Sequence, residues 1–233
     1  MEIKYYNSSL DDTNNLTTYD RKVIDTISNL ESLNIIFNKK LLYNTLKIVK
    51  QFEINKKKII LFGTGGSNLG ARALYNINNN KKIDIEFYDN IDPLTFEKSF
   101  DNIDFKTTGF IVISKSGNTP ETLAQFSTLY QIALQKNCID NFLSNIFIIT
   151  QTSNSALYKI GKEKNCLILE HNKEIGGRFS IFSNVGIVPA ILSGINIQDL
   201  YDGAADVINN VENYLYLNLA RHLYTKKKPK FSS

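Results

Sequence analysis

The sequence has few of the residues on which metal-binding and disulfide-stabilised proteins depend. Its 233 residues include two cysteines, Cys138 and Cys166, which lie in no metal-binding or redox spacing. We therefore interpret both as small hydrophobic residues in a reducing cytoplasm rather than as parts of a disulfide scaffold. The two histidines, His171 and His222, have no chemical partner nearby in the sequence, so we expect both to be structural or exposed.

Long apolar runs are also missing. The longest are of strand length, so we expect neither a membrane span nor a signal peptide, and we expect a cytoplasmic protein. The formal net charge is +4, with a lysine-rich stretch at residues 226–230. No aromatic interleaving or nucleic-acid motif accompanies these lysines. We therefore interpret the stretch as a solvated end, with neither nucleic acid nor a membrane as partner.

Short apolar segments alternate with stretches of helical periodicity over most of the chain. Alternation of this kind indicates an α/β fold, here a doubly wound parallel sheet of five strands, flavodoxin-like, with extra helices at both ends. In such sheets ligands bind outside the carboxyl ends of the strands. We expect strands at residues 59–62, 83–88, 109–114, 145–150 and 166–170, and helices at residues 17–37, 41–52, 68–77, 120–136, 153–162, 180–193 and 197–224.

A glycine-rich turn follows the first expected strand. Residues 63–70 read Gly-Thr-Gly-Gly-Ser-Asn-Leu-Gly, and Ser67 stands in the position of a helix N-cap. Glycines let the backbone approach a ligand closely, and the free N–H groups at the start of a helix attract anions. The turn therefore predicts an anion site.

A second loop with several hydroxyl groups follows the third expected strand, at residues 114–122. Within it, Thr119 is predicted to be an N-cap. If the two strands are neighbours, hydroxyl groups from both loops would converge on one anion; these are Ser67, Ser114, Ser116 and Thr119. Such a set suits a phosphate monoester, and Lys115 adds a positive charge. The alternative is that each residue is only a helix cap.

Two further features bear on the ligand. Gly63 and Gly65 followed by Asp89 imitate a dinucleotide-binding fingerprint, but the third glycine of that pattern would fall at Asn68. We therefore rank a dinucleotide below a sugar phosphate. After the fifth expected strand, two glycines precede Arg178, whose guanidinium group is suited to an anionic oxygen. A surface arginine on a turn is the alternative there.

The three loops together resemble the phosphoglucose isomerase (glucose-6-phosphate isomerase) family, which is built from sugar-isomerase (SIS) domains. The order and spacing of the motifs fit from residue 50 to about residue 205. The residues that carry the resemblance are 63–70, 114–122 and 176–180, with smaller similarities at residues 89–93 and 183–189.

The resemblance implies the interconversion of glucose 6-phosphate and fructose 6-phosphate through a cis-enediolate, with no cofactor and no metal. By position in the family motifs, Arg178 would stabilise the enediolate. Asn68 stands where an acidic residue is common in the family. The residues that would hold the phosphate are Gly66, Ser67, Ser114, Lys115, Ser116 and Thr119.

The family also supplies a glutamate base, a ring-opening histidine and a lysine from a second SIS domain, and the motif of that glutamate is absent here. Glu121 and Glu174 are the carboxylates near the loops. We expect an N-terminal helical segment (residues 1–54), a SIS domain (55–196) and helices leading to an absent second SIS domain (197–233). Two hypotheses stay open. One is an isomerase half that needs a separately encoded second half or a homodimer partner, and the other is a sugar-phosphate-binding or sensor module without chemistry.

Overall fold

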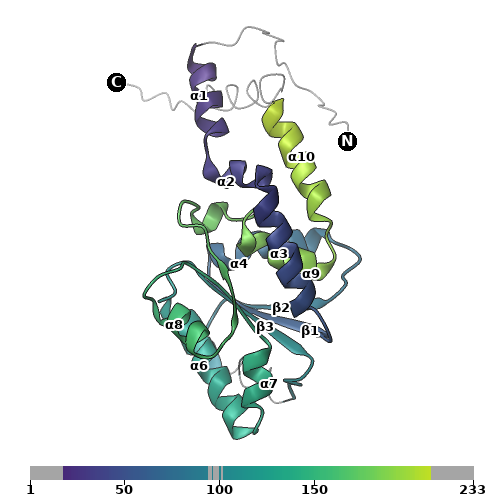
Figure 1. The fold of residues 1–233 in the computed structure, drawn as a ribbon, viewed down its shortest axis with the longest axis vertical. Helices are drawn as coiled ribbons and strands as arrows, with labels where there is room; N and C mark the ends of the chain where they lie inside the picture. The colour runs from purple at the N-terminus through teal and green to yellow at the C-terminus, as the bar shows by residue number, and fades with distance from the viewer. Residues whose placement is uncertain (1–17, 94–95, 97–99, 101, 211–233) are drawn as a thin grey trace, which may run out of the picture.

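The five expected strands form one parallel sheet in the computed structural model, which describes residues 18–210 apart from 94–95, 97–99 and 101 (Figure 1). The order in the sheet is β2-β1-β3-β4-β5, and every neighbouring pair is parallel. This order is that of flavodoxin-like sheets, so the predicted fold class is confirmed. The strands are β1 (Lys58–Phe62), β2 (Asp84–Tyr88), β3 (Thr108–Ser114), β4 (Ile146–Thr150) and β5 (Leu167–Glu170).

Helices cover both faces of this sheet (Figure 1). One face packs against α3 (Lys39–Phe52), α4 (Gly66–Ile77) and α9 (Asn184–Ser193). The opposite face packs against α6 (Pro120–Gln135), α7 (Ile139–Ser144) and α8 (Ala156–Glu163). The central strand β3 is buried along its whole length, because a strand covered on both faces is apolar at every position rather than at alternate ones.

Each face of the sheet has its own apolar core. Ile111 and Ile113 of β3 contribute to the core under α3, α4 and α9. Phe110 contributes to the opposite core, where its ring centroid lies 5.0 Å from that of Phe142. The two cores fix β1 and β3 firmly, so the loops at their carboxyl ends start from rigid positions.

The N-terminal helical region is divided where the sequence predicts one helix. The structure has α1 (Thr18–Ser28), α2 (Glu31–Asn34) and the 3₁₀ helix η1 (Ile35–Phe37). The chain is extended at Leu30, and this bend allows Ile35 and Ile36 to bury themselves in a third core with α10 (Ile197–Asn209). Packing against α10 therefore overrides the helical periodicity. Residues 211–224 of the last expected helix, His222 and the lysine-rich end lie outside the described residues.

Two helices begin later than the sequence pattern predicts, because serines cap them. Ser155 accepts a hydrogen bond from the Tyr158 backbone N–H at 3.4 Å and starts α8. Ser183 accepts from the Val185 backbone N–H at 3.4 Å and starts α9. The short helix α7 was not predicted. Within the described ranges no helix is long and apolar enough to cross a bilayer.

Candidate functional site

The turn between β1 and α4 is tighter than the sequence predicts. Helix α4 begins at Gly66 with Gly65 as its N-cap, so the prediction that Ser67 is the N-cap was wrong. Gly65 has a φ of +52°, a conformation that glycine adopts without a steric penalty, and its carbonyl accepts the Asn68 and Leu69 backbone N–H groups. Ser67 therefore lies in the first helical turn, half-buried.

Asn68 holds this turn from the inside. Its side chain is 1% exposed, and the amide nitrogen donates to the Gly63 carbonyl at 2.7 Å. A carboxylate could not donate this bond, so the amide suits the position where the family commonly has an acidic residue. The Asn68 Oδ1 atom is buried and has no hydrogen-bond partner.

The loop between β3 and α6 is organised by its own hydroxyl groups. The Ser114 and Thr119 hydroxyl oxygens lie 2.7 Å apart in a hydrogen bond, and the Gly117 N–H donates to Ser114 Oγ at 3.1 Å. Thr119 is the N-cap residue of α6, as predicted, although its hydroxyl bonds Ser114 instead of the helix. Ser116 is exposed, and its Oγ accepts the Asn118 N–H at 3.2 Å.

Because β1 and β3 are hydrogen-bonded neighbours, the two loops leave the sheet side by side. Phe62 at the end of β1 pairs with Val112 near the end of β3. The strands are parallel, so both loops lie at the carboxyl edge of the sheet, where ligands of this architecture bind. The two strands are thus neighbours, as is required if hydroxyl groups from both loops are to bind one anion.

A third segment, after β5, packs directly on the first loop. Arg178 lies in the 3₁₀ helix η2 (Gly177–Phe179), which packs against α4. A Cβ atom added to Gly66 would lie 2.6 Å from the Arg178 backbone nitrogen and 2.8 Å from Gly177 Cα. Only a residue without a side chain fits at Gly66.

The side chains of the third segment have contrasting surroundings. The Ser180 hydroxyl donates to the Gly177 carbonyl at 2.6 Å. Ser180 was not among the predicted site residues, although its place two residues after Arg178 was a usable signal. The Arg178 side chain is exposed, and among the described residues it has no hydrogen-bond or ion-pair partner. Its guanidinium group is therefore available to an anion.

The second loop also reaches this third segment. The half-buried Lys115 ammonium donates to the Ile175 carbonyl at 3.0 Å. His171 lies nearby, fully buried, with its Nδ1 atom 3.1 Å from the Asn172 carbonyl oxygen. Burial, with a smaller effect from the positive Lys115, lowers the pKa of His171 below its ordinary value of 6.5. A neutral, buried His171 agrees with the expectation of a structural role.

The carboxylates near the loops do not resemble an organised base. Glu121 is exposed in the first turn of α6. Glu174 is also exposed, and its closest charged contact is Lys173 at 3.8 Å. Asp89, the acidic residue of the dinucleotide alternative, pairs with Arg72 at 3.2 Å. A general base needs a defined position relative to the proton it removes, and the exposed Glu121 and Glu174 side chains show none.

The described residues form neither a metal-binding cluster nor, at Cys166, a reactive thiol. In the part of the chain that the structure describes, no three His, Cys, Asp or Glu side chains gather in a way that could hold a metal ion. Burial raises the pKa of the Cys166 thiol to about 11, so this thiol stays protonated near neutral pH. Cys166 packs beside the core under α6, α7 and α8, as expected of a small hydrophobic residue.

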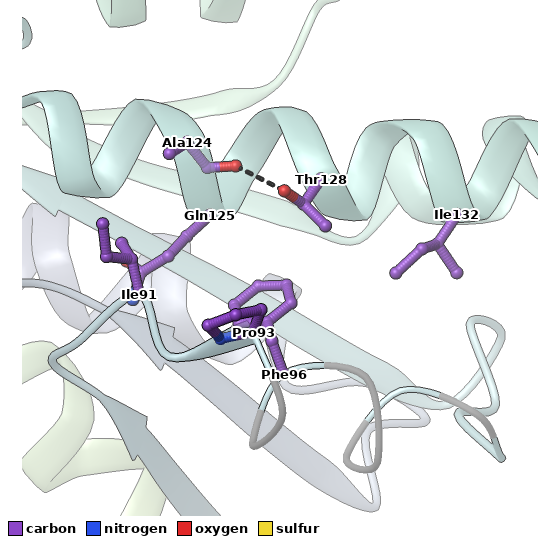
Figure 2. A pocket seen from close by; sticks show the side chains of 7 residues that line it. All are labelled: Ile91, Pro93, Phe96, Ala124, Gln125, Thr128 and Ile132. Carbon is purple, nitrogen blue, oxygen red and sulfur yellow. Dashed lines mark hydrogen bonds between the residues drawn. The ribbon is translucent and has the colours of Figure 1, made fainter.

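A hollow of about 430 Å³, lined by none of the predicted site residues, lies between α6 and the segment after β2 (Figure 2). The Gln125 amide at this hollow donates to the Asn90 carbonyl at 2.7 Å. Among the described residues that line the hollow, none has a charged side chain. The lining residues are Ile91, Pro93, Phe96, Ala124, Gln125, Thr128 and Ile132.

Comparison with known proteins identifies relatives of this chain. The profile of the family "Phosphoglucose isomerase" matches residues 47–214. A "Probable glucose-6-phosphate isomerase" of Methanococcus maripaludis is 38% identical over 165 residues, which are 68% of this chain and 37% of that protein. The glucose-6-phosphate isomerase of Mycoplasma capricolum is 30% identical over 199 residues, which are 80% of this chain and 45% of that protein.

Solved structures agree with the sequence comparison. The crystal structure of a glucose-6-phosphate isomerase from Chlamydia trachomatis superposes with a TM-score of 0.64 and 25% identity, over 75% of this chain and 34% of that one. A hypothetical protein from Thermus thermophilus shares the fold with a TM-score of 0.79. The chain spans less than half the length of the curated relatives described above. The family profile covers most of the chain, and the chain therefore belongs to the phosphoglucose isomerase family.

Proposed function

We propose that this chain binds glucose 6-phosphate and fructose 6-phosphate and supplies the phosphate-binding part of a glucose-6-phosphate isomerase. The observation that carries the proposal is the meeting of three loops at one edge of the sheet. The β1–α4 and β3–α6 loops follow neighbouring strands, and the Gly177–Arg178 backbone rests on Gly66.

The phosphate would be held mainly by hydroxyl groups, backbone N–H groups and two helix N-termini. A phosphate monoester carries about −1.5 to −2 charges at pH 7, and helix starts favour such an anion. The 2.7 Å separation of the Ser114 and Thr119 hydroxyl oxygens supports a shared acceptor, which would replace their mutual hydrogen bond. The proposed phosphate ligands are Gly66, Ser67, Ser114, Lys115, Ser116 and Thr119.

Arg178 would act on the reacting end of the sugar. In an aldose–ketose isomerisation a base removes a proton from one carbon and returns it to the neighbouring carbon, with an enediolate between the two steps. Negative charge develops on the enediolate oxygens, and a preorganised cation stabilises it. Arg178 is exposed and has no partner within the described ranges, so its charge is available for this task.

The base itself would come from a second unit, in the same or another polypeptide. Glu121 and Glu174 are exposed and lack a defined position. The segment after β5 that carries Arg178 is called the arginine segment (residues 171–180). Two large apolar side chains are also exposed, Phe179 of this segment at 64% and Leu69 of α4 at 57%, which fits a surface covered by such a unit. The proposal divides the chain into a helical segment (1–54), a SIS domain (55–196) and helices toward the second unit (197–233). A cytoplasmic location and a role in glycolysis and gluconeogenesis follow from the family.

The alternative is a sugar-phosphate-binding or sensor module that performs no chemistry. The exposed, unorganised carboxylates near the loops favour it. The two functions differ in whether adding the second unit produces turnover.

An aldose–ketose assay on residues 1–233, with and without the remaining part of a close relative, tests the proposal. We expect no measurable turnover by the chain alone, because a positioned base contributes about 10²–10⁴-fold. With the second unit, turnover should appear and Arg178→Ala should reduce it. Robust isomerisation by the chain alone would show that Glu121, Glu174 or another group is the base. No turnover with the second unit would favour the sensor module.

A further inference from the structure

We propose that Lys115 is a positioning residue, whose ammonium group fixes the segment that carries Arg178. This inference rests on the proposed function and assigns Lys115 a task beyond contact with the phosphate. The geometry behind it is the 3.0 Å hydrogen bond from Lys115 Nζ to the carbonyl of Ile175, three residues before Arg178.

The arginine segment crosses a large part of the sheet edge. It leaves the sheet at the end of β5, yet Gly177 and Arg178 rest on Gly66, which follows β1. In the order β1-β3-β4-β5, the segment therefore passes over the ends of β4 and β3 to reach the β1 loop. A surface segment of this length keeps one conformation only if contacts with the rest of the protein hold it in place.

Lys115 supplies one of those contacts. It directly follows β3, so its side chain meets the crossing segment between β5 and β1. The Lys115 backbone is itself anchored, since its carbonyl accepts the Gln151 N–H at 3.2 Å. Ile175 is 1% exposed, so its side chain holds the other end of the bond in the core.

The surroundings of the ammonium group favour this bond. Among the described residues no carboxylate pairs with Lys115, and the neighbouring His171 is kept neutral by burial. An ammonium group has three donors, so the bond to Ile175 leaves others for an anion on the β3–α6 loop. The Lys115 side chain therefore links the β3–α6 loop, which is proposed to bind phosphate, to the arginine segment.

Three variants test the proposal: Lys115→Met, Lys115→Arg and the matched control Lys136→Met. The control also removes a lysine that donates to a distant backbone carbonyl, that of Phe100 at 3.1 Å, but far from the arginine segment. The first readout, without ligand, is hydrogen exchange of the Phe179 and Ser180 amides, which donate to the Gly176 and Gly177 carbonyls. We expect exchange about tenfold faster in Lys115→Met, and exchange like that of the unmodified protein in the other two variants.

The second readout separates positioning from simple phosphate contact. It is the affinity for a sugar-phosphate hydroxamate, a planar mimic of the enediolate, divided by the affinity for inorganic phosphate. Lys115→Met should lower this ratio about tenfold, and Lys115→Arg should restore it. Unchanged amide exchange, or a parallel loss of both affinities, would overturn the proposal. If the unmodified protein binds neither compound, the proposed function fails, and amide exchange alone still decides whether Lys115 fixes the segment.

Discussion

Gly66 and Gly177, which are more than a hundred residues apart in the sequence, touch through their backbones. A Cβ atom on Gly66 would lie 2.8 Å from Gly177 Cα, closer than side-chain carbons are found in proteins. The contact joins the first turn of α4 to the segment that carries Arg178. It explains why a helix start that faces a proposed ligand has no side chain at its first position.

Gly66→Ala should therefore displace the arginine segment. Overpacking of this kind costs about 1–3 kcal/mol of unfolding free energy. Gly203→Ala is the matched control, because a Cβ there meets no atom of the described residues within 4 Å, and inside α10 the change should stabilise by about 0.5–1 kcal/mol. Urea unfolding of both variants measures the difference. Equal stability of Gly66→Ala and the unmodified protein would contradict the close contact.

The exposed apolar side chains beside the arginine segment should promote association of the chain on its own. Leu69→Ser combined with Phe179→Ser should reduce dye binding and self-association, measured by fluorescence and light scattering. Ile77→Ser is the control, since Ile77 is 70% exposed at the other end of α4. A monodisperse monomer of the unmodified chain that binds no dye would instead indicate a self-contained module.

His171 should make the stability depend on pH. Its pKa in the folded protein lies below the ordinary value of 6.5, so between these two values the unfolded chain binds more protons than the folded one. The contribution of His171 to the free energy of unfolding is complete above about pH 6.5. It is lost as the pH falls toward the pKa of His171 in the folded protein, and the free energy of unfolding then changes by at most about 1.4 kcal/mol per pH unit.

Denaturant unfolding of the unmodified protein and of His171→Gln between pH 7.5 and 5.5 measures this slope. The variant should show a flatter dependence, while His222→Gln serves as the control for replacing a histidine elsewhere in the sequence. An identical slope in His171→Gln would assign the pH dependence to other groups.

Much of the fold could be predicted because the apolar strands are short and bounded by turns. All five strands and their parallel arrangement follow from this pattern, as do the positions of the loops after β1 and β3. The errors occur where tertiary packing decides. The helix expected over residues 17–37 bends at Leu30 so that Ile35 can reach the core with α10.

The local details of the candidate site were harder to predict. A serine at a helix start is commonly a cap, yet Gly65 takes that position because its positive φ turns the chain earlier than Ser67 can. The hydrogen bond from Lys115 to the Ile175 carbonyl joins residues 60 positions apart, and no local sequence pattern predicts it. Contacts between loops depend on how the sheet orders its strands, and spacing in the sequence carries no information about them.

In the proposed function, hydroxyl groups and helix starts at this edge of the sheet hold the phosphate of a sugar phosphate. Calorimetric titration of the chain with glucose 6-phosphate, with glucose as the ligand control, tests it most directly. We expect binding of the phosphate ester alone. Combining Ser67→Ala with Thr119→Ala should weaken it strongly, since each hydrogen bond to a charged group contributes about 1.5–3 kcal/mol. Thr128→Ala should leave the affinity unchanged, because Thr128 lines the hollow beside α6 and its hydroxyl donates to the Ala124 carbonyl of the same helix. Equal affinity of the double variant and the unmodified chain, or equal binding of glucose, would contradict the account.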